Sequence, residues 1–355
     1  MKKCLLIALL PLLLASCNDQ GKKEEYLASW NQEAASLKTL REYIEDVTDE
    51  KSRNFIPKED RIATFDMDGT FYGELYPTYL EYWMLKYRAL EDETYDAPDD
   101  VKEAGQAIED YVKEGKSLPS GFELIHANMA AKAYAGMTIN EFDAYVKEYL
   151  KTPIDGFKGL TYGEGFYQPM LEVFDYLKAN DFDFYVVSGS DRYICRSLVC
   201  DSLDIPVDRV IGMDVELHGK DQGEVANVNY TYSYGEDVVR GEELLIKNLK
   251  MNKVMNIIQE IGKQPVLSFG NSGGDSAMHN YALTGNKYRS AAFMLVADDN
   301  ERDYAKKRGE DDAAFQSRID KLNTDWTNAK YNVISMKDDF KTIYKVGAEK
   351  TSFDW

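Results

Sequence analysis

Apolar residues recur at helical spacing in some stretches of the chain and form short unbroken runs in others. The first helical stripe consists of Leu37, Leu40, Ile44 and Val47. Ser29 and Gln32 precede it with the separation of a capping box, so we predict that the helix begins there. A second such pair, Thr138 and Glu141, predicts a helix with an apolar face formed by Phe142, Tyr145, Val146 and Leu150.

Three short, mainly apolar runs predict buried strands, at residues 61–65, 182–187 and 265–269. Each run is followed by small or polar residues and then by a helical pattern. This order predicts an α/β protein with a doubly wound parallel sheet, in which ligands bind at the carboxyl ends of the strands. Residues 76–155 are mainly helical in pattern, and a further strand is expected near residues 331–336.

Length and charge narrow the class of protein. The 355 residues suggest two compact units, or one unit with an insertion, and 12% aromatic residues are too many for a disordered chain. With 42 basic and 62 acidic side chains, the formal charge is −20. Nucleic acid is therefore not an expected partner, because its binding requires clustered Lys and Arg. A small phosphorylated substrate is compatible with this acidic chain if a metal ion supplies positive charge locally.

Residues 1–16 have the pattern of a bacterial lipoprotein signal peptide. Lys2 and Lys3 precede an apolar run, residues 5–14, that is too short to span a bilayer. The stretch Leu14-Ala15-Ser16-Cys17 resembles a lipobox, in which Cys17 is lipidated; a plain secretory signal is the alternative. We expect an exported lipoprotein, anchored to a membrane outside the cytoplasm through a tether of residues 17–28 and facing the periplasm or the cell surface.

The remaining cysteines, Cys195 and Cys200, lie five residues apart on a predicted helix. Their side chains would point in different directions, so two free thiols are favoured over a disulfide.

Two familiar motifs match the polar clusters only in part. The run beginning at Asp66 resembles an EF-hand calcium loop, but its sixth and twelfth positions hold Phe71 and Pro77 instead of Gly and an acid. Residues 270–274 fit the G-x-S-x-G pattern of a serine hydrolase with Ser272 as nucleophile. The only later histidine, His279, lies in the same predicted helix, so this alternative lacks a suitable base; His126 and His218 are not in a zinc-binding spacing either.

A third interpretation uses the polar clusters together. Asp66 and Asp68 follow a strand with their side chains toward one mouth of the sheet, where one can attack and the other can transfer a proton. Ser188, at the end of a second strand, offers a hydroxyl and neighbouring N–H groups to phosphoryl oxygens. Lys253 could neutralise these oxygens. Asp275 and Asn271 could help to hold Mg²⁺ beside Asp66.

These elements resemble, in order, the four motifs of the haloacid dehalogenase-like hydrolase superfamily. They are Asp66-Met67-Asp68-Gly69-Thr70, Ser188-Gly189-Ser190, Lys253 and Gly270-Asn271-Ser272-Gly273-Gly274-Asp275. The resemblance covers most of residues 60–300. It implies a Rossmann-like core, residues 29–75 and 156–355, with a helical cap inserted after the first motif, residues 76–155.

The resemblance also implies a reaction. Asp66 would attack phosphorus to form an aspartyl-phosphate, and Asp68 would protonate the leaving oxygen and then activate water. Mg²⁺ would be held by Asp66, the backbone carbonyl of Asp68, Asn271 and Asp275. Since the family's dehalogenases lack an acid at the second position, Asp68 indicates the phosphatase branch and therefore a phosphomonoesterase.

Two positions leave alternatives open. Asn271 stands where the family usually has an aspartate, so either Asp275 compensates or the metal site is impaired, which would give a lipoprotein that binds a phospho-ligand without turnover. For the catalytic lysine, Lys253 is preferred to Lys247 and Lys250 because it heads the apolar helix that leads into the fourth motif.

In the family the cap selects the substrate. Tyr76, Tyr79, Trp83 and Tyr87 are spaced as one helix face. The favoured interpretation is the core of the cap, and the alternative is an aromatic cage for a cationic headgroup. The layout is similar to that of bacterial phosphorylcholine phosphatases, and phosphoserine phosphatases share the motif order. Candidate substrate contacts are Thr70, Gly189, Tyr72, Glu74 and Trp83. The sequence identifies neither the physiological substrate nor the oligomeric state, and residues 300–355 give no functional signal.

Overall fold

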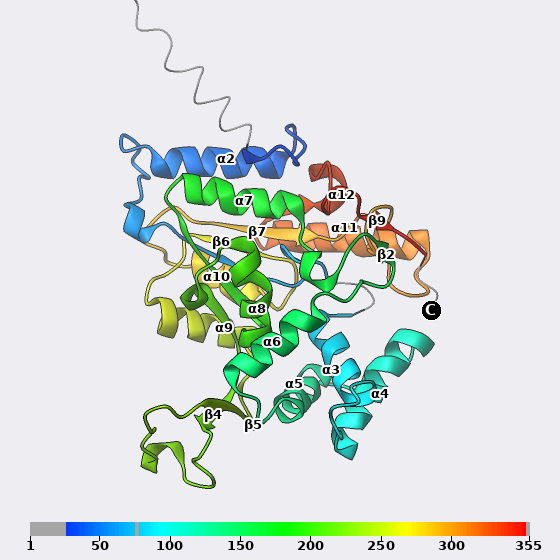
Figure 1. The fold of residues 1–355 in the computed structure, drawn as a ribbon. Helices are drawn as coiled ribbons and strands as arrows, with labels where there is room; N and C mark the ends of the chain where they lie inside the picture. Colours follow the sequence, from blue (N-terminus) through cyan, green and yellow to red (C-terminus); the bar gives the residue numbers. More distant parts are fainter. Residues whose placement is uncertain (1–25, 75–77, 353–355) are drawn as a thin grey trace, which may run out of the picture.

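The computed structural model describes residues 26–74 and 78–352 (Figure 1). The predicted signal peptide, Cys17, most of the predicted tether and Tyr76 lie outside the described residues. Within the described part of the chain, no helix is both long enough and apolar enough to cross a membrane.

Within residues 26–74 and 78–352, seven strands form a central sheet in the order β5-β4-β3-β1-β6-β7-β8. They are β1 (Ile62–Phe65), β3 (Asp183–Asp191), β4 (Val210–Gly219), β5 (Val238–Ile246), β6 (Leu267–Gly270), β7 (Ala291–Val296) and β8 (Asn332–Ser335). Neighbouring strands from β4 to β8 are parallel, which confirms the predicted α/β class. β5 is antiparallel to β4, an edge strand that the sequence analysis did not predict.

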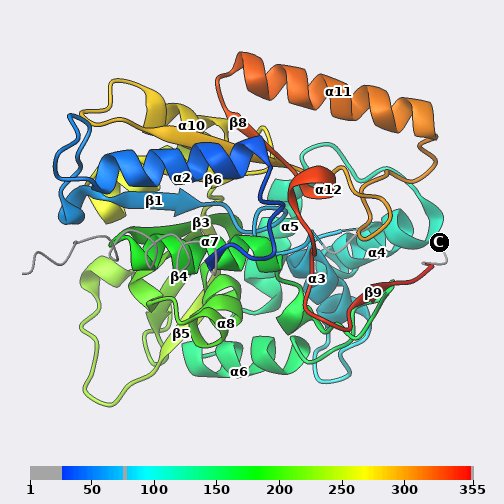
Figure 2. The same cartoon turned by 90° about the horizontal axis from the view of Figure 1, so that it is seen from above.

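The sheet is covered by helices on both faces, which is why its inner strands are mainly apolar. Figure 1 shows α2 (Ala35–Thr48) and α7 (Gln168–Ala179) above the sheet, with α8 (Arg192–Leu203), α9 (Met251–Asn256) and α10 (Ser276–Leu283) below it. In the core, Phe65 of β1 stacks on Phe269 of β6 with ring centroids 4.3 Å apart. Seen from above in Figure 2, α2 lies along the sheet and α11 (Asp312–Asn328) lies beside β8.

The first helix starts later than the capping prediction placed it. Its stripe of Leu37, Leu40, Ile44 and Val47 is buried as predicted. However, α2 begins at Ala35, and its N-cap residue Ala34 makes no side-chain cap. The Gln32 amide donates instead to the carbonyl oxygens of Leu27 and Trp30, so the Ser29–Gln32 capping box was wrong.

Between β1 and β3 the chain forms a group of helices, here called the α3–α6 unit. It contains α3 (Leu80–Leu90), α4 (Asp99–Glu114), α5 (Phe122–Ala133) and α6 (Ile139–Tyr149), which lie beside the sheet in Figure 1. At the start of α6, Thr138 and Glu141 form the predicted capping box. β5 adds to this unit, since Arg240 exchanges backbone hydrogen bonds with Gly136 and Met137 at 2.8 and 2.9 Å. The β4–β5 hairpin therefore joins the sheet to the α3–α6 unit.

The other described elements are short. β2 (Phe157–Lys158) pairs with β9 (Glu349–Lys350), and α12 (Met336–Asp339) follows β8. Single 3-10 turns occur at Lys58–Asp60, Tyr162–Glu164, Val207–Arg209 and Asn227–Asn229, and a π-helical turn, Ile257–Ile261, continues α9. Cys195 and Cys200 of α8 are free thiols, as the sequence favoured.

Candidate active site

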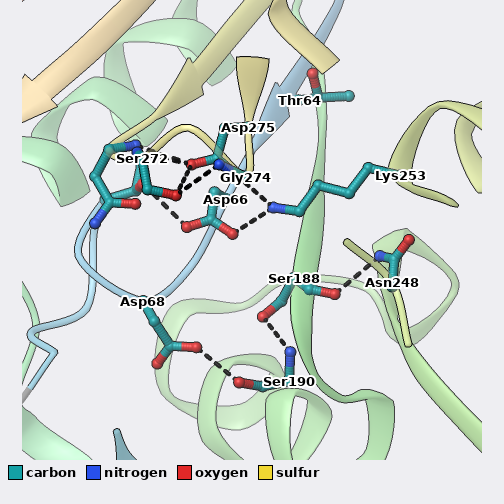
Figure 3. A network of polar contacts seen from close by, with 12 residues as sticks. Thr64, Asp66, Asp68, Ser188, Ser190, Asn248, Lys253, Ser272, Gly274 and Asp275 are labelled. Carbon is teal, nitrogen blue, oxygen red and sulfur yellow. Dashed lines mark hydrogen bonds and ion pairs between the residues drawn. The ribbon is translucent and has the colours of Figure 1, made fainter. Parts of the chain in front are cut away.

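A pocket of about 130 Å³ lies where β1, β3 and β6 end, with the α3–α6 unit on its other side. This is the place that a parallel α/β sheet offers to ligands. It is lined by Asp66, Asp68, Glu74, Tyr79, Glu81, Tyr82, Glu123, Gly189, Ser190, Lys247, Leu249, Lys253, Asn271, Ser272, Gly274 and Asp275. Figure 3 shows how Asp66, Lys253 and Asp275 face one another, with Asp68 and the serines of β3 close by.

Lys253 links the first and fourth motifs. Its Nζ lies 2.5 Å from Asp66 Oδ1 and 2.7 Å from Asp275 Oδ1, and the three side chains are buried (Figure 3). Burial alone would lower the pKa of Lys253, but the two carboxylates raise it, so the ammonium stays charged. Of the other two candidate lysines, Lys247 pairs with Glu81 and Lys250 is exposed. The geometry therefore favours Lys253 as the lysine that serves Asp66.

Asp66 is held by its neighbours on three sides. Its backbone N–H donates to the Phe269 carbonyl at 2.9 Å, which joins the ends of β1 and β6. Thr70 Oγ1 lies 3.3 Å from Asp66 Oδ2. Burial and the charge of Asp275 raise the pKa of Asp66 to about 6, although Lys253 works in the opposite direction. A carboxylate in this setting is ionised at neutral pH and fixed in direction, as a nucleophile requires.

Asp68 lies next to the serines near the end of β3. Its Oδ2 accepts a hydrogen bond of 2.7 Å from Ser190 Oγ, and the Ser190 N–H donates to Ser188 Oγ at 3.0 Å. Burial, and next the charge of Asp66, raises the pKa of Asp68 well above its usual range. Asp68 is thus suited to hold a proton that it can donate.

Ser188 does not hydrogen-bond to Asp68 and acts through Ser190, whose N–H donates to the Ser188 hydroxyl. Its side chain is fully buried and does not line the pocket, whereas Gly189 and Ser190 do. Its carbonyl accepts from Asn248 at 2.8 Å. The direct partner of Asp68 is therefore Ser190, which the sequence analysis did not single out, although it is the second serine of the Ser188-Gly189-Ser190 motif.

Asp275 shapes the turn after β6. Its Oδ2 accepts hydrogen bonds from the N–H groups of Asn271 and Ser272 at 3.1 and 3.0 Å, while Oδ1 accepts from Lys253. A Cβ at Gly270 would lie 2.6 Å from the Asp275 Cβ, so this close packing requires glycine there. Burial raises the pKa of Asp275, but Lys253 outweighs it and lowers the pKa. Both oxygens of Asp275 accept hydrogen bonds, so its side chain is tied to Lys253 and to the turn, and its role as a metal ligand stays a prediction.

Asn271 and Glu74 form a pair at the rim of the pocket. Asn271 Nδ2 donates to Glu74 Oε1 at 2.7 Å. The pair lies against Gly69, where an added Cβ would be 1.9 Å from Asn271 Nδ2 and 2.6 Å from Glu74 Oε1. Gly69 also has a φ of +76°, so the glycine of the first motif is needed for both reasons. Glu74 is exposed to solvent at this rim.

Glu81 is a pocket residue that sequence reasoning missed, and its partner Lys247 was considered only as an alternative catalytic lysine. Their side chains are buried and lie 2.8 Å apart. Glu81 Oε2 also accepts from the Asp191 N–H, and the Glu81 carbonyl hydrogen-bonds to His126 Nε2. Burial raises the pKa of Glu81, but Lys247 and His126 outweigh it and lower the pKa. Glu81 stands in an aromatic helix pattern, which gives no signal for a buried charge.

Three predicted substrate contacts, Thr70, Tyr72 and Trp83, do not line the pocket. The Tyr72 hydroxyl donates to the Tyr162 carbonyl at 2.6 Å, and its ring is fully buried. Trp83 lines a separate cavity of about 530 Å³. Of the four rings of the alternative aromatic cage, Tyr76 lies outside the described residues. The other three do not share one cavity, since Tyr79 and Trp83 line different cavities and Tyr87 packs on Tyr149 with ring centroids 5.5 Å apart. Tyr79 and Tyr82 are the rings that line the pocket, 5.4 Å apart between centroids.

Ser272 has no histidine base within the described residues. Its hydroxyl donates to Asp275 Oδ2 at 3.2 Å. His279 Nδ1 lies 2.7 Å from Ser268 Oγ instead, and burial lowers the pKa of His279 to about 4. His126 is buried in the α3–α6 unit beside Glu81. The serine-hydrolase alternative therefore loses its support.

Comparisons with known proteins give structural likeness only. No protein-family model matches this chain, and a search of curated proteins finds no similar sequence. Similar solved structures include a conserved protein of unknown function from Anaerococcus prevotii, with 14% identity over 87% of this chain and 94% of that one and a TM-score of 0.49. Cytosolic 5'-nucleotidase IIIB bound to cytidine has 11% identity over 87% of this chain and 86% of that one, with a TM-score of 0.46.

A phosphoserine phosphohydrolase-like protein from Francisella tularensis is also similar. It has 12% identity over 67% of this chain and 88% of that one, with a TM-score of 0.35. At these low identities and TM-scores, the likeness carries no inference about function.

Proposed function

We propose that this protein hydrolyses small phosphomonoesters, with Asp66 attacking phosphorus. The observation that carries the proposal is the Lys253 ammonium, which lies 2.5 Å from Asp66 and 2.7 Å from Asp275 in a pocket at the strand ends. A buried lysine in this position orients the nucleophile and offers positive charge to phosphoryl oxygens. The order of the four sequence motifs supports the same reaction.

The reaction is proposed to take two steps. Asp66 attacks phosphorus and forms an aspartyl-phosphate, while Asp68 gives its proton to the departing oxygen. Asp68 then removes a proton from a water molecule that attacks the same phosphorus, which releases inorganic phosphate and regenerates Asp66. The hydrogen bond from Ser190 Oγ orients Asp68 for both transfers.

The residues of the pocket fit a magnesium ion. Among the described residues, six carboxylates and two lysines line the pocket, so an anionic phosphate needs a further cation to enter. No group of three or more His, Cys, Asp or Glu side chains in the described ranges is arranged around one metal position. The proposed ligands are therefore mixed oxygens, from the Asp66 carboxylate, the Asp68 backbone carbonyl and the Asn271 amide. When bound, Mg²⁺ would stabilise the negative charge on the phosphoryl oxygens.

The leaving group has room beside the reaction site. Glu74, Tyr79, Tyr82, Asn271 and Ser272 also line a larger cavity of about 650 Å³, so the two cavities adjoin. This arrangement suits a phosphomonoester whose phosphate enters the small pocket and whose organic part lies in the larger one.

A generic aryl phosphate tests the proposed reaction. Purified protein with Mg²⁺ should release phosphate, and Asp66→Asn should lower kcat by at least about 1,000-fold, since an amide cannot replace the carboxylate as nucleophile. Chelation with EDTA should abolish the release, and added Mg²⁺ should restore it. Absence of turnover across a broad panel of phosphomonoesters would refute the proposal.

Binding of a phospho-ligand without turnover is the second candidate, and the neutral Asn271 is the observation that favours it. In that case, calorimetry would detect binding of the phosphomonoesters while no phosphate is released. The Asp66→Asn variant would then bind them as well as the wild type does.

For the cellular location, we propose an exported lipoprotein on the basis of the sequence pattern around Cys17. Expression in a bacterium with a clickable fatty acid should label the wild-type protein and should leave Cys17→Ser unlabelled. Equal labelling of the two would refute lipidation at this residue.

A further inference from the structure

Asn271 leaves the proposed metal site one carboxylate short. Asp275 does not replace this charge, because its oxygens accept hydrogen bonds from Lys253 and from the backbone of the turn. The nearest acidic partner of Asn271 is Glu74, whose Oε1 accepts from Asn271 Nδ2 at 2.7 Å. Glu74 comes from the segment after β1, and Asn271 follows β6, so the pair is formed only in the folded chain.

The hydrogen bond decides which way the Asn271 amide points. Since Nδ2 is the atom bonded to Glu74, Oδ1 is the atom left to face a cation, and no hydrogen bond to Oδ1 is found among the described residues. A carboxylate bound to the N–H side of an amide also draws negative charge onto the amide oxygen. Glu74 would thus orient the neutral Asn271 amide toward the cation. It would also place a negative charge close to the position where the family usually has an aspartate.

The chain makes room for this pair. The Cα of Gly69 faces both members, and any side chain there would overlap Asn271 Nδ2, since an added Cβ lies 1.9 Å from it. Gly69 directly follows Asp68, whose backbone carbonyl is a proposed metal ligand. The Glu74–Asn271 pair is therefore packed against the stretch of backbone that would contribute to the metal site.

We propose that Glu74 is a positioning residue for the divalent cation, and that it substitutes through Asn271 for the carboxylate that the fourth motif lacks. The inference rests on the proposed Mg²⁺ site. It makes residues 74 and 271 a linked pair, in which an acid at either position is sufficient to hold the cation.

A cycle of variants tests the linkage by metal binding. Affinity for Mn²⁺, a spectroscopic substitute for Mg²⁺, is measured by electron paramagnetic resonance in the full chain without substrate. Glu74→Gln should weaken binding by about 10- to 100-fold, the usual effect of removing an outer partner of a metal ligand. Glu74→Gln combined with Asn271→Asp should regain the wild-type affinity, because the acid now lies at position 271. Glu123→Gln, which removes another acid from the pocket wall, serves as the matched control and should bind as the wild type does.

The outcomes separate this inference from the proposed reaction. If Glu74→Gln binds Mn²⁺ as tightly as the wild type, or if the double variant stays as weak as Glu74→Gln, the linkage is refuted even when the protein is an active phosphatase. If the wild type binds no Mn²⁺, the inference also fails. If the linkage is found and no phosphomonoester is turned over, the inference stands and the proposed reaction fails. Circular dichroism of each variant confirms that a loss of binding is not a loss of fold.

Discussion

The ammonium nitrogen of Lys247 lies 2.8 Å from the carboxylate of Glu81, and both side chains are buried. Glu81 belongs to α3 of the α3–α6 unit, and Lys247 directly follows β5 of the sheet. The ion pair therefore joins the α3–α6 unit to the sheet at the wall of the pocket.

Removal of one member of this pair should cost much more stability than removal of both. Glu81→Gln leaves a buried ammonium without its counter-charge, so the free energy of unfolding should fall by about 3 kcal/mol. The double variant Glu81→Gln with Lys247→Met leaves no unpaired charge and should recover part of this loss. Urea unfolding of the wild type, Glu81→Gln, Lys247→Met and the double variant measures the interaction free energy between the two side chains.

Strict additivity of the two single changes would contradict this account of the Glu81–Lys247 pair. Lys151→Met is a suitable control, because Lys151 and Glu148 form an ion pair in which both side chains are exposed. Its effect should be below about 1 kcal/mol, as is usual for surface ion pairs.

The choice among the three lysines can be tested directly. Lys253→Met should lower kcat for an aryl phosphate by at least about 100-fold, because Asp66 would lose the charge that orients it and that faces the phosphoryl oxygens. Lys250→Met is the matched control, since Lys250 is exposed and three residues away. Equal activities of the two variants would show that Lys253 has no role in turnover.

The parts of the site that could be predicted from sequence are those fixed by local pattern. When a turn of small polar residues follows a strand, the side chains of the turn lie at the carboxyl edge of the sheet. This local pattern is sufficient to identify Asp66 and Asp275. Lys253 was found because it heads the helix before β6. The glycine-rich turn between β6 and α10 can be identified from its own residues, without knowledge of contacts to distant parts of the chain.

The parts that could not be predicted depend on tertiary packing. Whether Tyr82 or Trp83 faces the pocket depends on the rotation of α3 about its axis, and one helical stripe does not determine that rotation. The Glu81–Lys247 pair joins residues that are 166 positions apart in the chain, so no spacing rule reveals it. The predicted Ser29–Gln32 capping box does not form, because the Gln32 amide donates to the carbonyl oxygens of Leu27 and Trp30.

The corrected positions of the aromatic rings lead to a prediction for substrate binding. Tyr79 lines the pocket and the adjoining larger cavity, whereas Trp83 lines neither. Tyr79→Ala should therefore raise KM for an aryl phosphate several-fold, and Trp83→Ala should leave KM unchanged. Steady-state kinetics at saturating Mg²⁺ compare the two variants.

Trp83→Ala should instead lower stability, because the ring is 8% exposed and its removal leaves a cavity. A loss of about 3 kcal/mol is typical for such a truncation. A larger rise of KM in Trp83→Ala than in Tyr79→Ala would contradict the placement of these rings.

A buried aspartate away from the pocket predicts how stability changes with pH. Burial raises the pKa of Asp303 to about 6, above its usual 3.8. Between these two values the unfolded chain has lost this proton while the folded chain still holds it, so folding becomes less favourable as the pH rises. Stability from this group is fully present below about pH 4 and is lost as the pH passes about 6.

Asp303→Asn removes this titration and can keep the hydrogen bond from the Tyr304 N–H to the side chain. The variant should be more stable than the wild type by roughly 3 kcal/mol at pH 7.5, and the two should be similar near pH 4. Urea unfolding across this range measures the difference, with Asp221→Asn as the control because Asp221 is exposed. A difference between Asp303→Asn and the wild type that does not change with pH would show that the effect comes from packing and not from the proton, because only the titration of Asp303 varies over this window.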